Sequence, residues 1–142
     1  MNETRHEIPM ATNIEQSRRL LACGVDLDSA DMYWNHFIIQ EPYLVIGEIP
    51  RDNETGEVMD NEDVPAWSLS ALLAVLPQRE IAPHGNTPCD LYIHHYPEFW
   101  LVMYHDGKTS GDAEDYTWQC ASEQRAETLV EACVKMIEWL KL

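Results

Sequence analysis

The sequence predicts an α+β fold in which a small antiparallel sheet of two to four strands carries two or three helices. Two observations lead to this class. Apolar residues recur at helical spacing in residues 68–77 and 128–140, whereas residues 91–96 and 100–105 alternate as strands do. The chain of 142 residues suits one domain with its own core. We therefore expect residues 12–142 to form a single domain, preceded by a flexible arm over residues 1–11.

The helix expected at residues 68–77 is the clearest element. Ser68 can cap its first turn, and Trp67 and Leu72 are placed for a hydrophobic staple. Pro77 ends the helix because proline lacks the amide hydrogen. A short helix is marginal alone, so its apolar stripe must be covered. We expect the strands between residues 91 and 120 to cover it, with the helix at 128–140 beside it on the same sheet.

A second helix and a single helical turn are expected nearer the N-terminus. Thr12 and Glu15 match a capping box, and Gly24 can end the helix in a left-handed turn. Asp28 or Ser29 can cap the short turn that follows. This turn would present three large side chains that need burial, namely Met32, Tyr33 and Trp34.

Residues 43–49 are rich in β-branched side chains between two prolines, which predicts a strand. The next stretch, residues 51–63, holds six carboxylates and almost no apolar residue, which indicates a solvated loop. It superficially resembles a calcium-binding loop. However, its glycine stands at the fifth position, and Asp63 replaces the glutamate of the twelfth. We interpret its acidity as chance.

The C-terminal half predicts a meander followed by a helix. After a loop over residues 78–88, the strands at 91–96 and 100–105 are joined by a turn, and residues 116–120 predict a third strand. Thr128 and Glu131 match another capping box. The last helix then has one apolar face, made of Leu129, Val130, Cys133, Met136, Ile137 and Leu140.

The net charge of the chain is strongly negative. Twenty-five acidic residues stand against nine basic ones, which gives a formal charge of −16. Such a charge repels phosphate backbones and anionic lipid, so we expect neither nucleic-acid nor membrane binding. Three roles remain for the acidity: plain solubility, recognition of a basic partner, or mimicry of nucleic acid by a decoy that binds a host DNA-binding protein.

The N-terminal residues are polar and show no apolar segment of a secretion signal, so we expect a cytoplasmic protein. The cysteines are widely spaced and form no CxxC pair. This spacing predicts neither a zinc site nor a redox pair, and we expect free buried thiols. The four are Cys23, Cys89, Cys120 and Cys133.

The histidines raise the question of a metal site or a catalytic base. His94 and His95 are adjacent in a predicted strand and therefore point to opposite faces, so one ion cannot bind both. His105 precedes Asp106, which could orient it as a base, but both stand where a tight turn places polar residues anyway. A small metal-dependent hydrolase that uses His94, His95 or His105 is the enzymatic alternative.

No nucleophile is indicated either. Ser68 and Ser70 lie at a helix start, where capping explains them, and neither stands in a GxSxG motif. Asp90 beside Cys89 would raise the pKa of the thiol and so reduce its reactivity. Glycine-rich phosphate loops are absent from the sequence. We therefore predict no catalytic, cofactor-binding or metal-ligating residue and no cofactor.

Three segments carry a resemblance to known proteins. They are residues 29–32, residues 64–73 and residues 131–140, with the sequences SADM, VPAWSLSALL and EACVKMIEWL. Together with the aromatic hairpin, they resemble a family of small uncharacterised proteins of Bacteroides-type bacteria and of their phages or mobile elements. The order of elements is more distantly similar to that of phage α-β-α sandwich proteins. The resemblance implies an origin in a mobile element and brings no activity with it.

These observations together predict a small acidic intracellular protein that is not an enzyme. We expect it to bind a protein partner, or a second copy of itself, as an accessory factor of a phage or mobile element. The acidic decoy and the metal-dependent hydrolase are the alternatives. The sequence leaves open whether three aromatic side chains belong to the core or to an interface, namely Tyr33, Trp34 and Trp139.

Overall fold

A computed structural model describes residues 10–37, 40–60, 62–77, 79–81, 88–105 and 123–140. The elements are, in chain order, α1 (Ile14–Ala22), η2 (Leu27–Ser29, a 3-10 helix), β1 (Met32–Phe37), β2 (Gln40–Ile46), β3 (Val64–Ala66), α2 (Leu69–Val75), β4 (Arg79–Ile81), β5 (Pro88–His95), β6 (Trp100–His105), β7 (Gln124–Ala126) and α3 (Leu129–Leu140).

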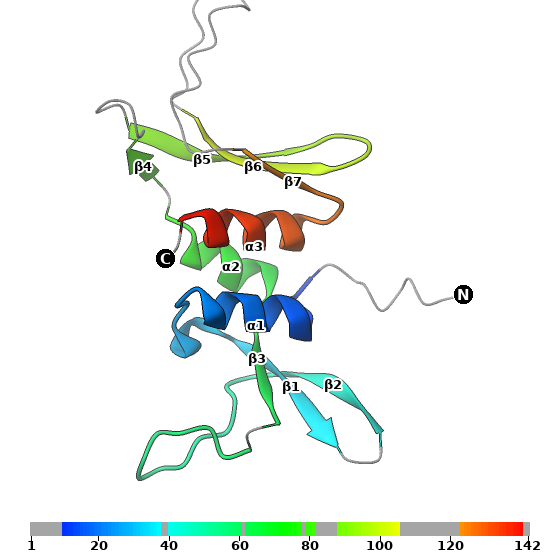
Figure 1. Cartoon of the computed structure of the whole chain (residues 1–142), viewed down its shortest axis with the longest axis vertical. Helices are drawn as coiled ribbons and strands as arrows, with labels where there is room; N and C mark the ends of the chain where they lie inside the picture. Colours follow the sequence, from blue (N-terminus) through cyan, green and yellow to red (C-terminus); the bar gives the residue numbers. More distant parts are fainter. Residues whose placement is uncertain are drawn as a thin grey trace, which may run out of the picture.

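The elements form three layers, with the α-helices between two small antiparallel sheets (Figure 1). One sheet has the strand order β2-β1-β3 and the other β4-β5-β6-β7. The predicted α+β class and small antiparallel sheet are confirmed. The sequence pattern predicts one sheet, because the residues of β1 also fit a helical turn, whereas the structure has two sheets.

Helix α1 begins one residue later than predicted. Its N-cap is Asn13, and a reciprocal capping box joins Asn13 to Gln16 rather than Thr12 to Glu15. Thr12 is instead completely buried, where its hydroxyl accepts a hydrogen bond from the Trp67 amide at 3.0 Å. The predicted end is confirmed, since Gly24 adopts a φ of 96° directly after the C-cap residue.

The prediction of a single helical turn that presents Met32, Tyr33 and Trp34 is wrong. The 3-10 helix ends at Ser29, and these three residues open β1, the central strand of the first sheet. Aromatic side chains fit a strand with a neighbour on each side, and pairing with β2 and β3 satisfies the backbone. The strand predicted at 43–49 exists as β2 but ends earlier, before Gly47, whose φ is 128°.

Helix α2 confirms the predicted element and its cap. The Ser68 hydroxyl accepts a hydrogen bond from the Ala71 amide at 3.1 Å, and the helix ends just before Leu76 and Pro77. Trp67 and Leu72, the predicted staple, are both completely buried. Helix α2 packs on α3, and its C-terminal end reaches the second sheet, where the Tyr104 hydroxyl donates to the Pro77 carbonyl oxygen at 2.7 Å.

Replacing Ser68 with alanine is expected to lower the free energy of unfolding by about 1–2 kcal/mol, because the first turn of α2 loses its cap. Urea denaturation measures the change. Ser70→Ala is the matched control, since Ser70 lies exposed in the first turn of the same helix. Equal losses in the two variants would contradict a capping role for Ser68.

The predicted hairpin is confirmed as β5 and β6, paired from Asp90 with His105 to His95 with Trp100. The predicted third strand at 116–120 lies outside the described residues, and β7 is the strand that pairs with the other side of β6. Strand β4 lies within the stretch predicted as a loop and pairs with the start of β5.

Helix α3 is buried on more sides than its predicted stripe. Ala132 and Val134 lie outside that stripe, yet both are 0% exposed, as is Cys133 within it. The reason is the position of α3, which contacts β6 and β7 as well as α1 and α2. One of the two hydrogen bonds of the predicted capping box is present, in which the Glu131 amide donates to the Thr128 hydroxyl at 3.1 Å.

The first described residues pair with the start of α2. Ala11 forms an isolated antiparallel bridge with Ser68, and the Leu69 amide donates to the Met10 carbonyl oxygen at 2.9 Å. Of the arm predicted over residues 1–11, residues 1–9 lie outside the described part. No helix among the described residues is long and apolar enough to cross a membrane.

Candidate functional site

The three histidines of the hairpin, His94, His95 and His105, do not converge. His95 stacks on Trp100 with ring centroids 3.9 Å apart, while His94 lies against Tyr96 at 4.4 Å, on the other face of β5. His105 is paired in the ladder with Asp90, and its ring lies 5.8 Å from that of Tyr92. The described residues contain no group of three or more potential metal ligands. They do not assemble the site that the hydrolase alternative requires.

Ser68 belongs to a structural network. Its amide and hydroxyl both donate to the Asp31 carboxylate, while Ser29 accepts from the Trp67 indole at 2.8 Å. The hydroxyl also caps α2, so it is bound on both sides. This network ties the segment before β1 to the start of α2. The hydroxyl is held between the Asp31 carboxylate and the Ala71 amide, which agrees with the capping interpretation.

The expectation of free thiols is wrong for Cys89. This residue is completely buried at the start of β5 and is disulfide-bonded. Cys23 and Cys133 are free, so the partner of Cys89 lies outside the described residues, as does Cys120. Burial raises the pKa of the Cys133 thiol to about 12, and burial together with Glu138 raises the pKa of Cys23. Neither free thiol is activated as a nucleophile.

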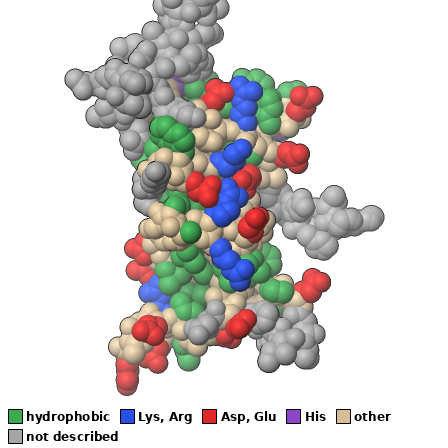
Figure 2. All heavy atoms as spheres, in the orientation of Figure 1, with side chains coloured by type: hydrophobic (Ala, Val, Ile, Leu, Met, Phe, Trp, Pro, Cys, Tyr) green, Lys and Arg blue, Asp and Glu red, His purple; other side chains and the backbone are tan. Residues whose placement is uncertain are grey.

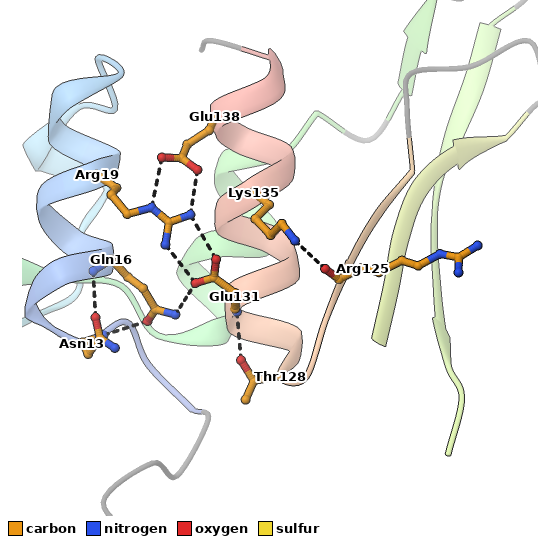
Figure 3. Close-up of polar contacts among 8 residues, drawn as sticks. All are labelled: Asn13, Gln16, Arg19, Arg125, Thr128, Glu131, Lys135 and Glu138. Atoms are coloured by element: carbon orange, nitrogen blue, oxygen red, sulfur yellow. Dashed lines mark hydrogen bonds and ion pairs between the residues drawn. The ribbon is translucent and has the colours of Figure 1, made fainter. Parts of the chain in front are cut away.

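The main polar cluster joins α1 to α3 (Figure 3). The Arg19 guanidinium donates two hydrogen bonds to the Glu131 carboxylate, each at 3.0 Å, and two to Glu138, at 3.0 and 2.7 Å. Gln16 also donates to Glu131, at 2.7 Å. Gln16 contacts Glu131, and Arg19, further along α1, reaches on to Glu138, two turns further along α3, so the two helices run parallel. The hydrogen bonds to Glu138 and Glu131 raise the pKa of Arg19 above its ordinary value.

A shallow hollow of about 430 Å³ lies beside this cluster and is lined by Arg19, Ala22, Cys23 and Glu138. Its charged groups are paired with each other, and the Cys23 thiol donates to the Leu20 carbonyl oxygen at 3.3 Å. Among the described residues of the lining, each polar side chain is engaged in one of these contacts. We therefore interpret the cluster as a clamp between helices.

Replacing Arg19 with methionine is expected to lower the free energy of unfolding by about 1–2 kcal/mol at neutral pH, because two partly buried carboxylates lose their charged donor. Arg19 holds the pKa of Glu138 below its ordinary value of 4.5. A lowered carboxyl pKa stabilises the fold above the unfolded value, and this contribution is lost as the pH falls through the folded value. The difference between the two proteins should therefore shrink below pH 4.5.

Urea denaturation between pH 7 and pH 3 measures this effect. Arg18→Met is the matched control, because Arg18 is the preceding residue of α1 and is exposed. A difference between wild type and Arg19→Met that stays constant down to pH 3 would contradict the assigned ion pairs.

The surface charge is unevenly divided. On the face shown in Figure 2, basic side chains lie in a line along the long axis with acidic side chains beside them. In the described part of the chain, ion pairs join Arg19 to Glu131 and Glu138, Arg51 to Asp28, and Arg125 to Glu123. Residues 48–63, by contrast, contain seven carboxylates and one arginine.

The acidic loop between β2 and β3 uses several of its carboxylates to shape turns. Asp52 accepts hydrogen bonds from the amides of Glu54 and Thr55, which lower its pKa, and Asp60 accepts from the Glu62 amide. Gly56 adopts a φ of 76°. These are local turn contacts. They agree with the interpretation of a solvated loop and do not converge on a cation site.

Two apolar side chains are exposed on β2, one on each face of the first sheet. Ile46 of β2 is 82% exposed and Tyr43 is 43% exposed. None of the described apolar side chains of β1 and β2 is fully buried; they are Met32, Tyr33, Trp34, Pro42, Tyr43, Leu44, Val45 and Ile46. Strands normally bury at least one apolar face. This sheet is therefore the candidate binding surface, which the sequence analysis did not single out.

The open question about the aromatic residues is answered in part. Trp34 is half-buried, and its indole donates to the Thr12 carbonyl oxygen at 2.9 Å, so it joins the first sheet to α1. Tyr33 is also half-buried on β1. Trp139 is 43% exposed on α3.

Comparison of the chain with protein-family models, with curated proteins and with solved structures gives no match. The resemblance to Bacteroides-type proteins and their phages or mobile elements therefore stays a prediction.

Proposed function

We propose that this chain is a non-enzymatic protein-binding factor, and that it serves a phage or mobile element as an accessory protein. The observation that carries the proposal is the exposure of large apolar side chains on an ordered sheet, with Ile46 at 82%. Exposed apolar surface on regular structure is typical of interaction sites. In addition, the polar clusters of the described residues are engaged in capping, helix clamping and turn formation.

Affinity purification from the native host, after crosslinking in cells, tests this proposal. The bait is the full chain, and the control bait is an unrelated protein of equal length and net charge, which removes binding by charge alone. We expect a protein that is enriched on the first bait and forms a complex when both are purified, with a Kd of about 10 µM or lower. A result in which no protein exceeds the control would contradict the proposal.

The acidic decoy remains a second candidate because of one feature, the seven carboxylates against one arginine in residues 48–63. A decoy occupies the DNA-binding surface of its partner. Double-stranded DNA would then compete with this chain for the captured protein. A captured partner that does not bind DNA removes this candidate and leaves the general proposal in place.

The compartment follows from the state of Cys89. The cytoplasm is the compartment expected from the sequence, but disulfides persist in oxidising compartments and are rare in the cytoplasm. The disulfide bond of Cys89 therefore favours an oxidising compartment. Trapping thiols in cells with a maleimide reagent decides between them. In a reduced, cytoplasmic chain the reagent modifies all four cysteines after denaturation. In an oxidised chain it modifies only Cys23 and Cys133.

A further inference from the structure

Strand β2 is an outer strand of the first sheet, and its hydrogen-bonding directions follow from one contact. The Gly47 amide donates to the Asp31 carbonyl oxygen at 2.9 Å, which makes this pair a hydrogen-bonded pair of the antiparallel ladder. Such pairs alternate along the strands. Val45 and Tyr33 therefore form the next hydrogen-bonded pair, in agreement with the observed register.

The intervening residues of β2 point their backbone groups away from β1. These residues are Leu44 and Ile46, each with one N–H and one C=O directed to the open side of the strand. Pro42 lies where the register between β1 and β2 shifts, so its missing N–H removes no regular hydrogen bond of the ladder. In the part of the chain that the structure describes, no strand pairs with this side of β2, so two donors and two acceptors form an edge to which another strand can add.

The side chains at this edge suit an apolar strand partner. Leu44 and Ile46 lie on the same face as Trp34 and Met32, their neighbours across the ladder. Ile46 remains 82% exposed, so this face is incompletely covered at the open edge. An added strand with apolar residues at alternate positions would bury Ile46.

The charges near the edge distinguish between partners. Exposed carboxylates stand on both sides of the open stretch, at Glu41 and Glu48, and the acidic residues 48–63 follow directly. A second copy would bring the same carboxylates and another charge of −16, and the two copies would repel each other. A basic segment would be attracted instead.

We propose that β2 binds an extended, lysine- or arginine-rich segment of a partner protein as a fourth strand of the first sheet. This rests on the proposed protein-binding function and names its surface and its partner class. Backbone hydrogen bonds to Leu44 and Ile46 supply the docking, apolar side chains cover Ile46, and basic side chains face Glu41 and Glu48.

Three short capped peptides of equal length test the proposal on the full chain: alternating lysine and valine, alternating lysine and glycine, and alternating glutamate and valine. Fluorescence anisotropy should show that the lysine-valine peptide binds at least about tenfold tighter than either of the others. Hydrogen exchange followed by NMR should show slower exchange of the Leu44 and Ile46 amides in its presence. Equal binding of the two lysine peptides, no binding, or unchanged exchange at these amides would overturn the proposal.

Two variants separate this proposal from the general one. Ile46→Pro removes an edge donor and should weaken binding of the lysine-valine peptide about tenfold, whereas Asn53→Pro, at an exposed turn position of the acidic loop, should not. If the captured partner binds Ile46→Pro as well as wild type, strand addition is wrong and the protein-binding function stands. If purification captures nothing, that function fails, and the exchange experiment still decides whether β2 accepts a strand.

Discussion

Replacing Trp67 with alanine is expected to lower the free energy of unfolding by about 3–5 kcal/mol, because a large, completely buried side chain leaves a cavity in the core. The loss includes the indole hydrogen bond to Ser29. Urea denaturation followed by circular dichroism measures the change. Trp139→Ala is the matched control, since Trp139 is 43% exposed and should change the stability by about 1 kcal/mol or less.

Trp67 has this effect because it lies where the first sheet meets the helices. It directly follows β3 and precedes the cap of α2, and its backbone exchanges hydrogen bonds with Thr12 just before α1. Its side chain belongs to the same core cluster as Leu72 and Val102. Similar losses in Trp67→Ala and Trp139→Ala would show that the first sheet does not depend on this residue.

The elements that the sequence predicts correctly are those with complete local signals. Helix α2 has a cap residue, an apolar stripe and a terminating proline within ten residues, from Ser68 to Pro77. The hairpin of β5 and β6 has two alternating segments and a turn between them. In both cases local preference and tertiary packing agree, so the pattern alone suffices.

The errors occur where tertiary contacts decide between two local solutions. Thr12 and Asn13 are both acceptable caps, and Asn13 takes the role because the Thr12 hydroxyl is bound to Trp67 and Ser17 in the core. Met32, Tyr33 and Trp34 could be placed on a helical turn or in a strand. Pairing with β2 and β3 places them in a strand. These partners are distant in sequence, since Met32 pairs with Ala66, 34 residues away.

The site features depend even more on distant residues. Arg19 and its carboxylate partners are separated by 112 and 119 positions, so spacing could not reveal the clamp. The open edge of β2 exists only because the first sheet ends there, which is a property of topology. A signal for the edge was nevertheless present, since Pro42 within a β-branched segment is typical of an outer strand.

Reducing the disulfide of Cys89 is expected to lower the free energy of unfolding by about 2–4 kcal/mol, because the unfolded chain gains conformations that the bond excludes. Cys89 is 0% exposed and lies in the core cluster with Val102 and Tyr104, so the bond anchors a core strand. Urea denaturation with and without a phosphine reductant measures the loss. Thiol titration of the denatured, unreduced chain should find two reactive thiols out of four.

The control for this experiment is Cys89→Ala, in which the reductant should have little further effect on stability. Cys23→Ala and Cys133→Ala should keep the full response to reductant, because both residues are free in the structure. A wild-type protein whose stability is unchanged by reduction, with four titratable thiols before treatment, would show that the bond does not form. The buried thiol of Cys89 would then fit the core as a small apolar side chain, and the reduced state of the chain would favour a reducing compartment.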